Sequence, residues 1–114
     1  MAFSEIELKR IDKIVGGLSR QKTPQGLENE LRFEYRIKNH EVLILEIRPR
    51  WDDPQEQTEM SVAKFRFNRT KNTWQLYWQR ASGKWLAYNE STNSTTLDEL
   101  VEVVSEDSYG CFFG

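Results

Sequence analysis

Two neighbouring segments alternate between apolar and polar side chains, and this alternation limits the possible folds more than any other feature of the sequence. The apolar positions are Ala63, Phe65 and Phe67 within residues 61–69, and Trp74, Leu76 and Trp78 within residues 73–80. A period of two is typical of a strand that buries one face. A two-residue loop at Lys71-Asn72 would pair Phe67 with Leu76, so that the two apolar faces coincide. The pattern therefore predicts an antiparallel β-hairpin with one buried face.

Three more strands are predicted around this hairpin. Residues 31–38 alternate strictly between apolar and charged side chains, which is typical of a half-buried strand. Residues 42–47 are apolar on both faces, which indicates a central strand. A short strand from Trp85 to Tyr88 follows the turn at Ser82-Gly83. The short connections favour an antiparallel meander.

The register of the first hairpin has two solutions. A two-residue turn at Asn39-His40 pairs Phe33 with Glu46 and places a charge on the apolar face, which carries a desolvation cost. A three-residue turn instead sets Glu34 opposite Glu46, which is also unfavourable. The sequence leaves both registers open, and in either case the second face of residues 42–47 carries apolar side chains that need a cover.

Two helices flank the strands. Residues 4–18 have apolar side chains at helical spacing, with a capping box formed by Ser4 and Glu7, and we expect Gly16-Gly17 to weaken or end this helix. A second helix is predicted to begin after Thr96, which caps it together with Glu99 and which precedes apolar side chains at helical spacing. The predicted fold class is α+β: one domain over residues 1–114, an antiparallel meander sheet of about five strands, and an N-terminal and a C-terminal helix on one face of the sheet.

Composition and charge exclude several classes of protein but do not indicate a particular function. The net charge is −2, and residues 91–114 contain five acidic and no basic side chains, so the whole chain lacks the charge of a nucleic-acid-binding protein. A single cysteine excludes an internal disulfide, and a single histidine disfavours zinc clusters. No apolar stretch approaches a membrane span. We therefore expect a cytoplasmic protein that has no cofactor and does not contact a membrane.

Three segments together resemble a known family. They are Glu46 to Pro54 (EIRPRWDDP), Tyr77 to Trp85 (YWQRASGKW) and Tyr109 to Gly114 (YGCFFG). In this order they resemble the small bacterial proteins grouped as domain of unknown function 3024, over nearly the whole chain. The resemblance implies a bacterial origin and a stand-alone domain. It implies no activity, and it assigns no residue to a site.

The polar face of the predicted sheet is the better candidate for a binding surface. Arg36, Lys64, Arg66 and Tyr77 share this face with Arg32, Lys38 and a single carboxylate, Glu34. Cations beside an exposed aromatic ring can hold single-stranded nucleic acid through phosphate contacts and stacking. A simple solvated face would show the same charges, because Lys and Arg also prevent aggregation at sheet edges.

A metal-dependent phosphoesterase is the alternative. Glu46, Asp52 and Asp53 could bind a hard cation beside Arg48 and Arg50. The same aspartates are also ordinary turn residues before a proline.

A nucleophile–base pair of Cys111 and His40 is a weaker candidate, because no third group orients it. We therefore interpret the chain as a non-catalytic binding or interaction module, with no catalytic residue assigned and no metal site. Its partner is either single-stranded nucleic acid or another protein, and the chain itself is a monomer or a homodimer.

The C-terminal Phe112 and Phe113 are expected to be docked. Burying one Phe is worth about 1.5–3 kcal/mol. The uncovered face of residues 42–47 offers a site for them, and Gly110 permits the reversal that would take them there. The alternative is that the tail contacts a partner.

Overall fold

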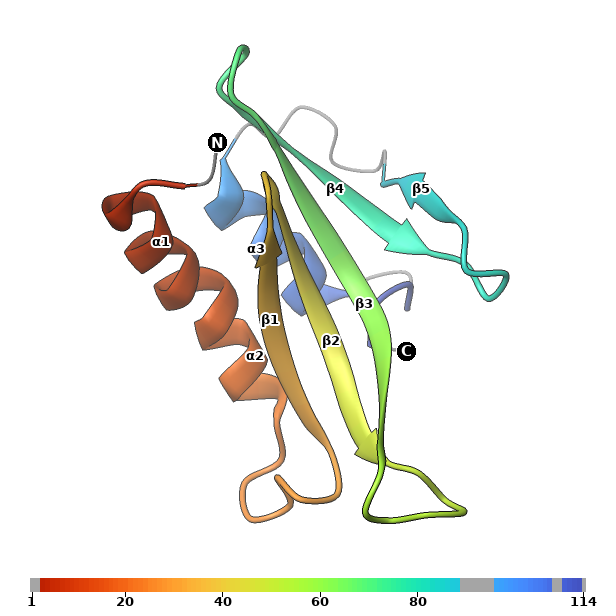
Figure 1. Cartoon of the computed structure of the whole chain (residues 1–114). Helices are drawn as coiled ribbons and strands as arrows, with labels where there is room; N and C mark the ends of the chain where they lie inside the picture. The colour runs from red at the N-terminus through yellow and green to blue at the C-terminus, as the bar shows by residue number, and fades with distance from the viewer. Residues whose placement is uncertain (1–2, 89–95, 108–109, 114) are drawn as a thin grey trace.

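The computed structural model describes residues 3–88, 96–107 and 110–113, and it contains one antiparallel sheet with helices on one face (Figure 1). The strands pair in chain order from β1 to β5, which confirms the predicted meander. The elements are α1 (Glu5–Ile11), a π-helical segment (Asp12–Gly16), α2 (Gly17–Lys22), β1 (Arg32–Lys38), β2 (Glu41–Pro49), β3 (Gln57–Asn68), β4 (Thr73–Gln79), β5 (Trp85–Ala87) and α3 (Leu97–Glu106).

The first helix begins as predicted and ends later than predicted. The Ser4 hydroxyl accepts from the Glu7 amide at 3.2 Å, and the Glu7 carboxylate accepts from the Ser4 amide at 2.8 Å. Gly16 and Gly17 do not end the helix, which continues to Lys22. At Gly16 the reason is packing: a Cβ there would lie 2.9 Å from Cε1 of Tyr35, so the glycine permits the Tyr35 ring of β1 to contact the helix closely.

The β1–β2 hairpin adopts the two-residue turn. Asn39 has a φ of 55°, a left-handed conformation that Asn tolerates well. Phe33 therefore pairs with Glu46, and Tyr35 pairs with Ile44. The Glu46 carboxylate, on the otherwise apolar face, pairs with the Arg48 guanidinium at 3.1 Å.

The predicted β3–β4 hairpin exists, but its register differs from the prediction by two residues. Phe67 pairs with Trp74 and Phe65 pairs with Leu76. The connection is longer than two residues because the Asn68 side chain accepts from the Lys71 amide at 3.1 Å and Asn72 is left-handed at φ 54°. A shift of two keeps the same side chains on the same face, so the apolar faces still coincide.

The C-terminal tail is docked, although on a different face from the one expected. Phe113 packs edge-on against Phe33 with ring centroids 5.1 Å apart, and Phe112 packs against Tyr88 at 5.2 Å. Both contacts are on the helix-bearing face, in the main core. The carboxylate of Asp107, the residue that caps α3, accepts from the Phe112 and Phe113 amides at 3.0 and 2.8 Å, which holds the tail beside the helix that precedes it.

Candidate binding surface on the helix-free face

The helix-free face of the sheet carries all four predicted binding residues. Strand register places Arg36, Leu43, Lys64 and Tyr77 in one row across β1 to β4. Arg66 lies two residues further along β3, on the same face. The structure therefore brings the four predicted side chains onto one surface, but it gives them different neighbours.

Over β1 and β2, the arginines are held by acceptors. Arg36 binds the Glu59 carboxylate through both terminal nitrogens. Arg32 binds Glu34 at 2.6 Å and the Gln57 side chain at 3.3 Å. The hydrogen bonds that Arg36 donates to Glu59 lower the pKa of the Glu59 carboxyl and raise the pKa of the Arg36 guanidinium. We call this region the paired half of the helix-free face.

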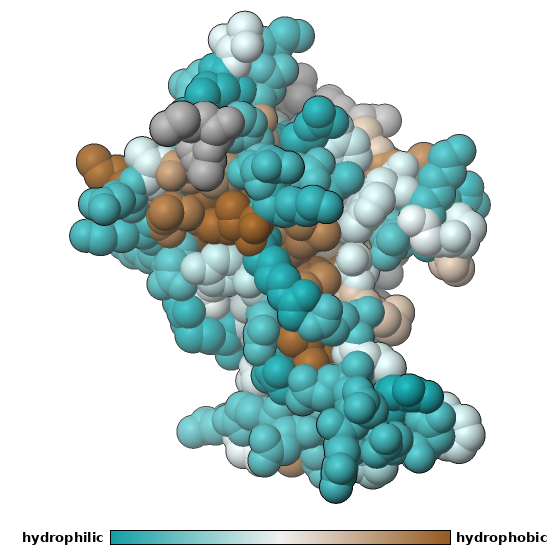
Figure 2. Space-filling view, viewed as in Figure 1, coloured by the Kyte–Doolittle hydropathy of each residue, from teal (hydrophilic) through white to brown (hydrophobic). Residues whose placement is uncertain are grey.

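The paired half covers the apolar side chains that β2 presents away from the helices. Leu45 is 7% exposed and Ile47 is 2% exposed. Ile47 lies between Arg32 of β1 and Glu59 of β3 in the strand register. Figure 2 shows this face, with apolar surface along the middle of the sheet between hydrophilic side chains that cross it. The long stems of Arg side chains can cover apolar surface while the charged ends stay in water.

A β-bulge explains why Glu59 lies here. The pairing of β2 with β3 shifts between Ile44 and Leu45, so that Ala63 pairs with Ile44 whereas Ser61 pairs with Leu45. Val62 is the extra residue, and it is buried in the core with Ala63. Beyond the bulge, the residues that face away from the helices are the odd-numbered ones, which include Glu59. A regular strand would have turned Glu59 toward the other face.

Over β3 to β5, Lys64 lies between two aromatic rings. Its ammonium nitrogen is 4.9 Å from the Tyr77 ring centroid and 4.7 Å from that of Trp85. The same nitrogen lies 3.7 Å from Oε2 of Glu41, and the Lys64 side chain is only 16% exposed. Trp85 thus adds a second aromatic side chain to this face, which the sequence pattern did not assign to it. Trp85 pairs with Gln79, which lies two residues after Tyr77 on β4 and therefore on the same face. A pairing of the short strand with β4 would have predicted this position of Trp85.

The β3–β4 hairpin end of this face has an open hollow of about 600 Å³. Its lining includes His40, Arg66, Arg69, Lys71 and Tyr77, and none of the described residues that line it is acidic. Arg69 pairs with Glu7 at 3.2 Å. In the described part of the chain, Arg66 and Lys71 form no ion pair. We call this region, together with Lys64, Tyr77 and Trp85, the open half of the helix-free face.

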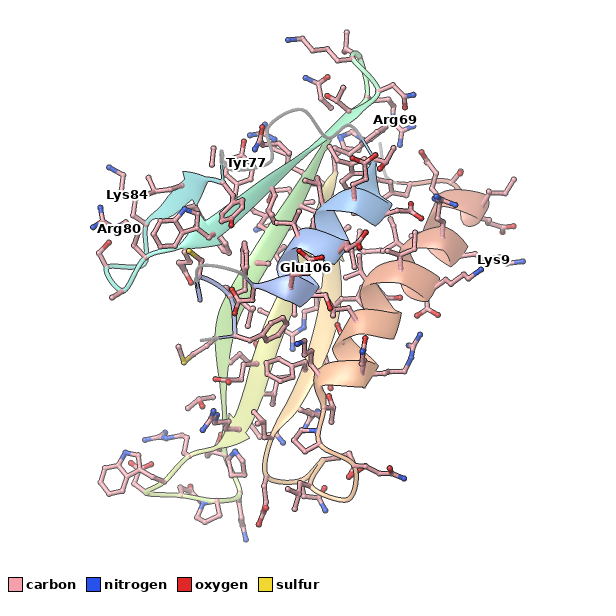
Figure 3. All side chains as sticks on the ribbon, turned by 180° about the vertical axis from the view of Figure 1, so that it is seen from behind. Lys9, Arg69, Tyr77, Arg80, Lys84 and Glu106 are labelled. Atoms are coloured by element: carbon pink, nitrogen blue, oxygen red, sulfur yellow. The ribbon has the colours of Figure 1, made fainter. Side chains whose placement is uncertain are left out.

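Figure 3, seen from the helix-bearing side, shows where further basic residues lie around β4. Tyr77 lies on β4, with Arg80 and Lys84 at the β4–β5 turn and Arg69 at the other end of the β3–β4 ribbon. Neither Arg80 nor Lys84 has an ion pair among residues 3–88, 96–107 and 110–113.

The three carboxylates of the alternative hydrolase each have a separate neighbour. Glu46 pairs with Arg48, and Asp52 is bound by Arg50 at 3.0 and 2.7 Å. Asp53 accepts from the Gln55 amide at 3.2 Å, as in an ordinary aspartate turn. Within the described residues, no group of three His, Cys, Asp or Glu side chains is placed to hold a metal ion. This arrangement is turn and ion-pair chemistry.

The remaining candidate pair consists of His40 at the β1–β2 turn and Cys111 in the docked tail. His40 packs edge-on against Phe3, with ring centroids 6.0 Å apart, and its Nε2 atom is buried without a hydrogen-bond partner among the described residues. Its backbone carbonyl accepts from the Phe67 amide at 2.9 Å. These contacts give His40 a packing role beside the hairpin.

Comparison with known proteins identifies the family. A family model described as "Domain of unknown function (DUF3024)" matches residues 3–114. The chain belongs to this family. Separate comparisons with curated proteins and with solved structures found no match. Across the described residues of this DUF3024 chain, no helix is long and apolar enough to cross a membrane. Family membership brings no activity with it, so a function has to be argued from the surface itself.

Proposed function

We propose that this chain is a non-catalytic module that binds single-stranded nucleic acid on the open half of the helix-free face. The observation that carries the proposal is the hollow whose described lining combines Arg66, Arg69 and Lys71 with Tyr77 and contains no carboxylate. Arg66 and Lys71 form no ion pair in the described chain, so they can contact phosphates with no internal partner to displace. Arg69 would have to exchange its Glu7 partner for a phosphate. Aromatic rings beside such cations give bases a surface for stacking.

The aromatic pair supports a single strand over a duplex. Tyr77 and Trp85 are half-buried and flank the Lys64 ammonium. Bases must be unstacked to reach side-chain rings, and single strands offer such bases whereas duplexes do not. We further propose the bacterial cytoplasm as the location. The single cysteine excludes internal disulfide bonds, and proteins without such bonds suit the reducing cytosol.

The test is a titration of fluorescently labelled oligo-dT and oligo-U by anisotropy at low salt. Affinity should fall as salt rises, because each phosphate contact releases counterions. The double variant Arg66→Ala/Lys71→Ala should weaken binding, and the slope of log affinity against log salt should become shallower by about 0.7 for each phosphate that the variant no longer neutralises.

The matched control changes the same number of charges elsewhere. Lys9 and Lys13 are exposed on the first helix, so Lys9→Ala/Lys13→Ala should leave affinity and slope close to those of the parent protein. Absence of binding at high micromolar protein and low salt would refute the proposal. An equal loss in both double variants would also refute it, because only net charge would then matter.

A further inference from the structure

A second surface feature lies outside the open half: the tip of the β2–β3 loop. Trp51 at this tip is 94% exposed. The residues on either side of it, Arg50 and Asp52, form an ion pair, and the Arg50 amide donates to the Glu56 carbonyl at 2.9 Å. The Glu56 amide in turn donates to the Asp53 carbonyl at 2.9 Å. The loop backbone is therefore held in one shape, so that a partner would meet a large exposed aromatic side chain on a pre-formed loop.

The charges around Trp51 restrict what can cover it. Arg50 and Asp52 neutralise one another, whereas Asp53 and Glu56 form no ion pair within the described ranges. The tip is therefore acidic. It repels the phosphates of nucleic acids and of anionic lipids, and it complements a protein surface with cations around an aromatic-lined hollow.

The open half of the same chain is a surface of this chemistry. Its hollow has Tyr77 in its lining, with Arg66 and Lys71 as cations without ion pairs in the described chain. Strand β3 runs from the Trp51 loop to this hollow, and its 12 residues span about 40 Å at the rise of a strand. The longest dimension of the molecule is 45 Å, and Figure 1 shows the loop and the hairpin at opposite ends. Trp51 therefore cannot reach the hollow of its own chain.

We propose that Trp51 of one copy docks in the hollow of a second copy, with Asp53 and Glu56 against Arg66 and Lys71 of that copy. The contact joins different surfaces of the two copies, so it is heterologous and each end of the pair can bind again. Such a small end-to-end contact falls in the class of weak, transient interfaces. Self-association should therefore appear only at high concentration, and salt should weaken it.

Sedimentation equilibrium of the purified full chain, without nucleic acid, tests the proposal from micromolar to millimolar concentration. We expect the average mass to rise continuously past that of a dimer at low salt and to return to the monomer mass at high salt. Trp51→Ala and Arg66→Glu should each remain monomeric throughout. The control Leu27→Ala removes an exposed apolar side chain from the loop before β1 and should associate like the parent protein.

Mixing the two monomeric variants gives the sharper result. Trp51→Ala keeps the hollow and Arg66→Glu keeps the tryptophan, so an equimolar mixture should form a dimer of twice the monomer mass and grow no further. A monomeric parent protein at all concentrations would overturn the proposal. Association of Trp51→Ala at the parent level would also overturn it. Trp51→Ala should still bind oligonucleotides, so failure of this inference is distinguishable from failure of the proposed function.

Discussion

The two faces of the sheet are covered in different ways. On one face, helices and the C-terminal tail bury a continuous set of aromatic and aliphatic side chains, including Phe65 and Leu76, which are fully buried. On the other face, no helix of the described chain is present, yet Leu45 and Ile47 are nearly as inaccessible. There the cover consists of arginines and their carboxylate partners, and it stops before β4.

The difference shows what decides whether a surface arginine is available for binding. Arg36 and Arg66 are both exposed and lie on the same face. Glu59 occupies Arg36, whereas Arg66 has no acidic partner in the described structure. An ion-paired side chain has to give up its partner before it binds a phosphate, while an unpaired one does not. Charge counts alone therefore overestimate how much of a basic face is open to ligands.

The largest expected effect concerns Ile47. If the ion-paired cover creates a real second core, Ile47→Ala should lower the free energy of unfolding by about 2–4 kcal/mol, as for other buried aliphatic truncations. Urea denaturation followed by circular dichroism measures this. Met60→Ala, which truncates an exposed side chain on the neighbouring strand, should cost much less. Equal and small losses in both variants would mean that the helix-free face has no core.

The two adjacent glycines of the first helix test the helix-bearing face. Gly16→Ala places a Cβ 2.9 Å from the Tyr35 ring and should destabilise the protein by about 1–3 kcal/mol through overpacking. A Cβ added at Gly17 would have no neighbouring atom within 4 Å, so Gly17→Ala should stabilise by about 0.5–1 kcal/mol through helix propensity. Thermal melts of both variants measure the contrast. Shifts of the same sign would show that Tyr35 does not pack tightly here.

Much of this architecture was predictable because side-chain alternation is a local signal. The alternation of Phe65 and Phe67 with Lys64 and Arg66 assigns each residue to its face, whatever the register. The hairpin register itself was missed by two residues because it depends on turn geometry at Asn68 rather than on the apolar pattern.

The acidic partners of the basic face could not be predicted in the same way. Residues 57–60 are Gln, Thr, Glu and Met, which show no apolar alternation, yet they form the first part of β3 because they pair with the long strand β2. The bulge at Val62 then turns Glu59 onto the helix-free face. Both effects come from tertiary pairing, so the count of one carboxylate on this face missed Glu59. It also missed Glu41, because β2 begins one residue before the predicted strand.

The tail was misplaced for a related reason. Its apolar character predicts docking, but the choice of face depends on where α3 ends. The carboxylate of Asp107 binds the amides of Phe112 and Phe113 directly, so the tail turns back beside its own helix. A local cap thus directs the tail to the core that is already present, and the arginines cover the other face.

The smallest expected effect separates the charge of this cover from its bulk. In the folded protein, hydrogen bonds from Arg36 lower the pKa of Glu59 below its ordinary value of 4.5. A lowered carboxyl pKa contributes stability that is present above the unfolded value and is lost as the pH falls through the folded value. Glu59→Gln should therefore be slightly less stable than the parent protein at neutral pH, and the gap should close as the pH falls below about 4.5. Urea unfolding of both proteins between neutral pH and about pH 3, at low and high salt, measures it.

Because the pair is exposed, salt should also narrow the gap at neutral pH. A gap that persists at low pH and in high salt would mean that Glu59 acts through packing over Ile47, in which case the charge of the pair does not contribute to the cover.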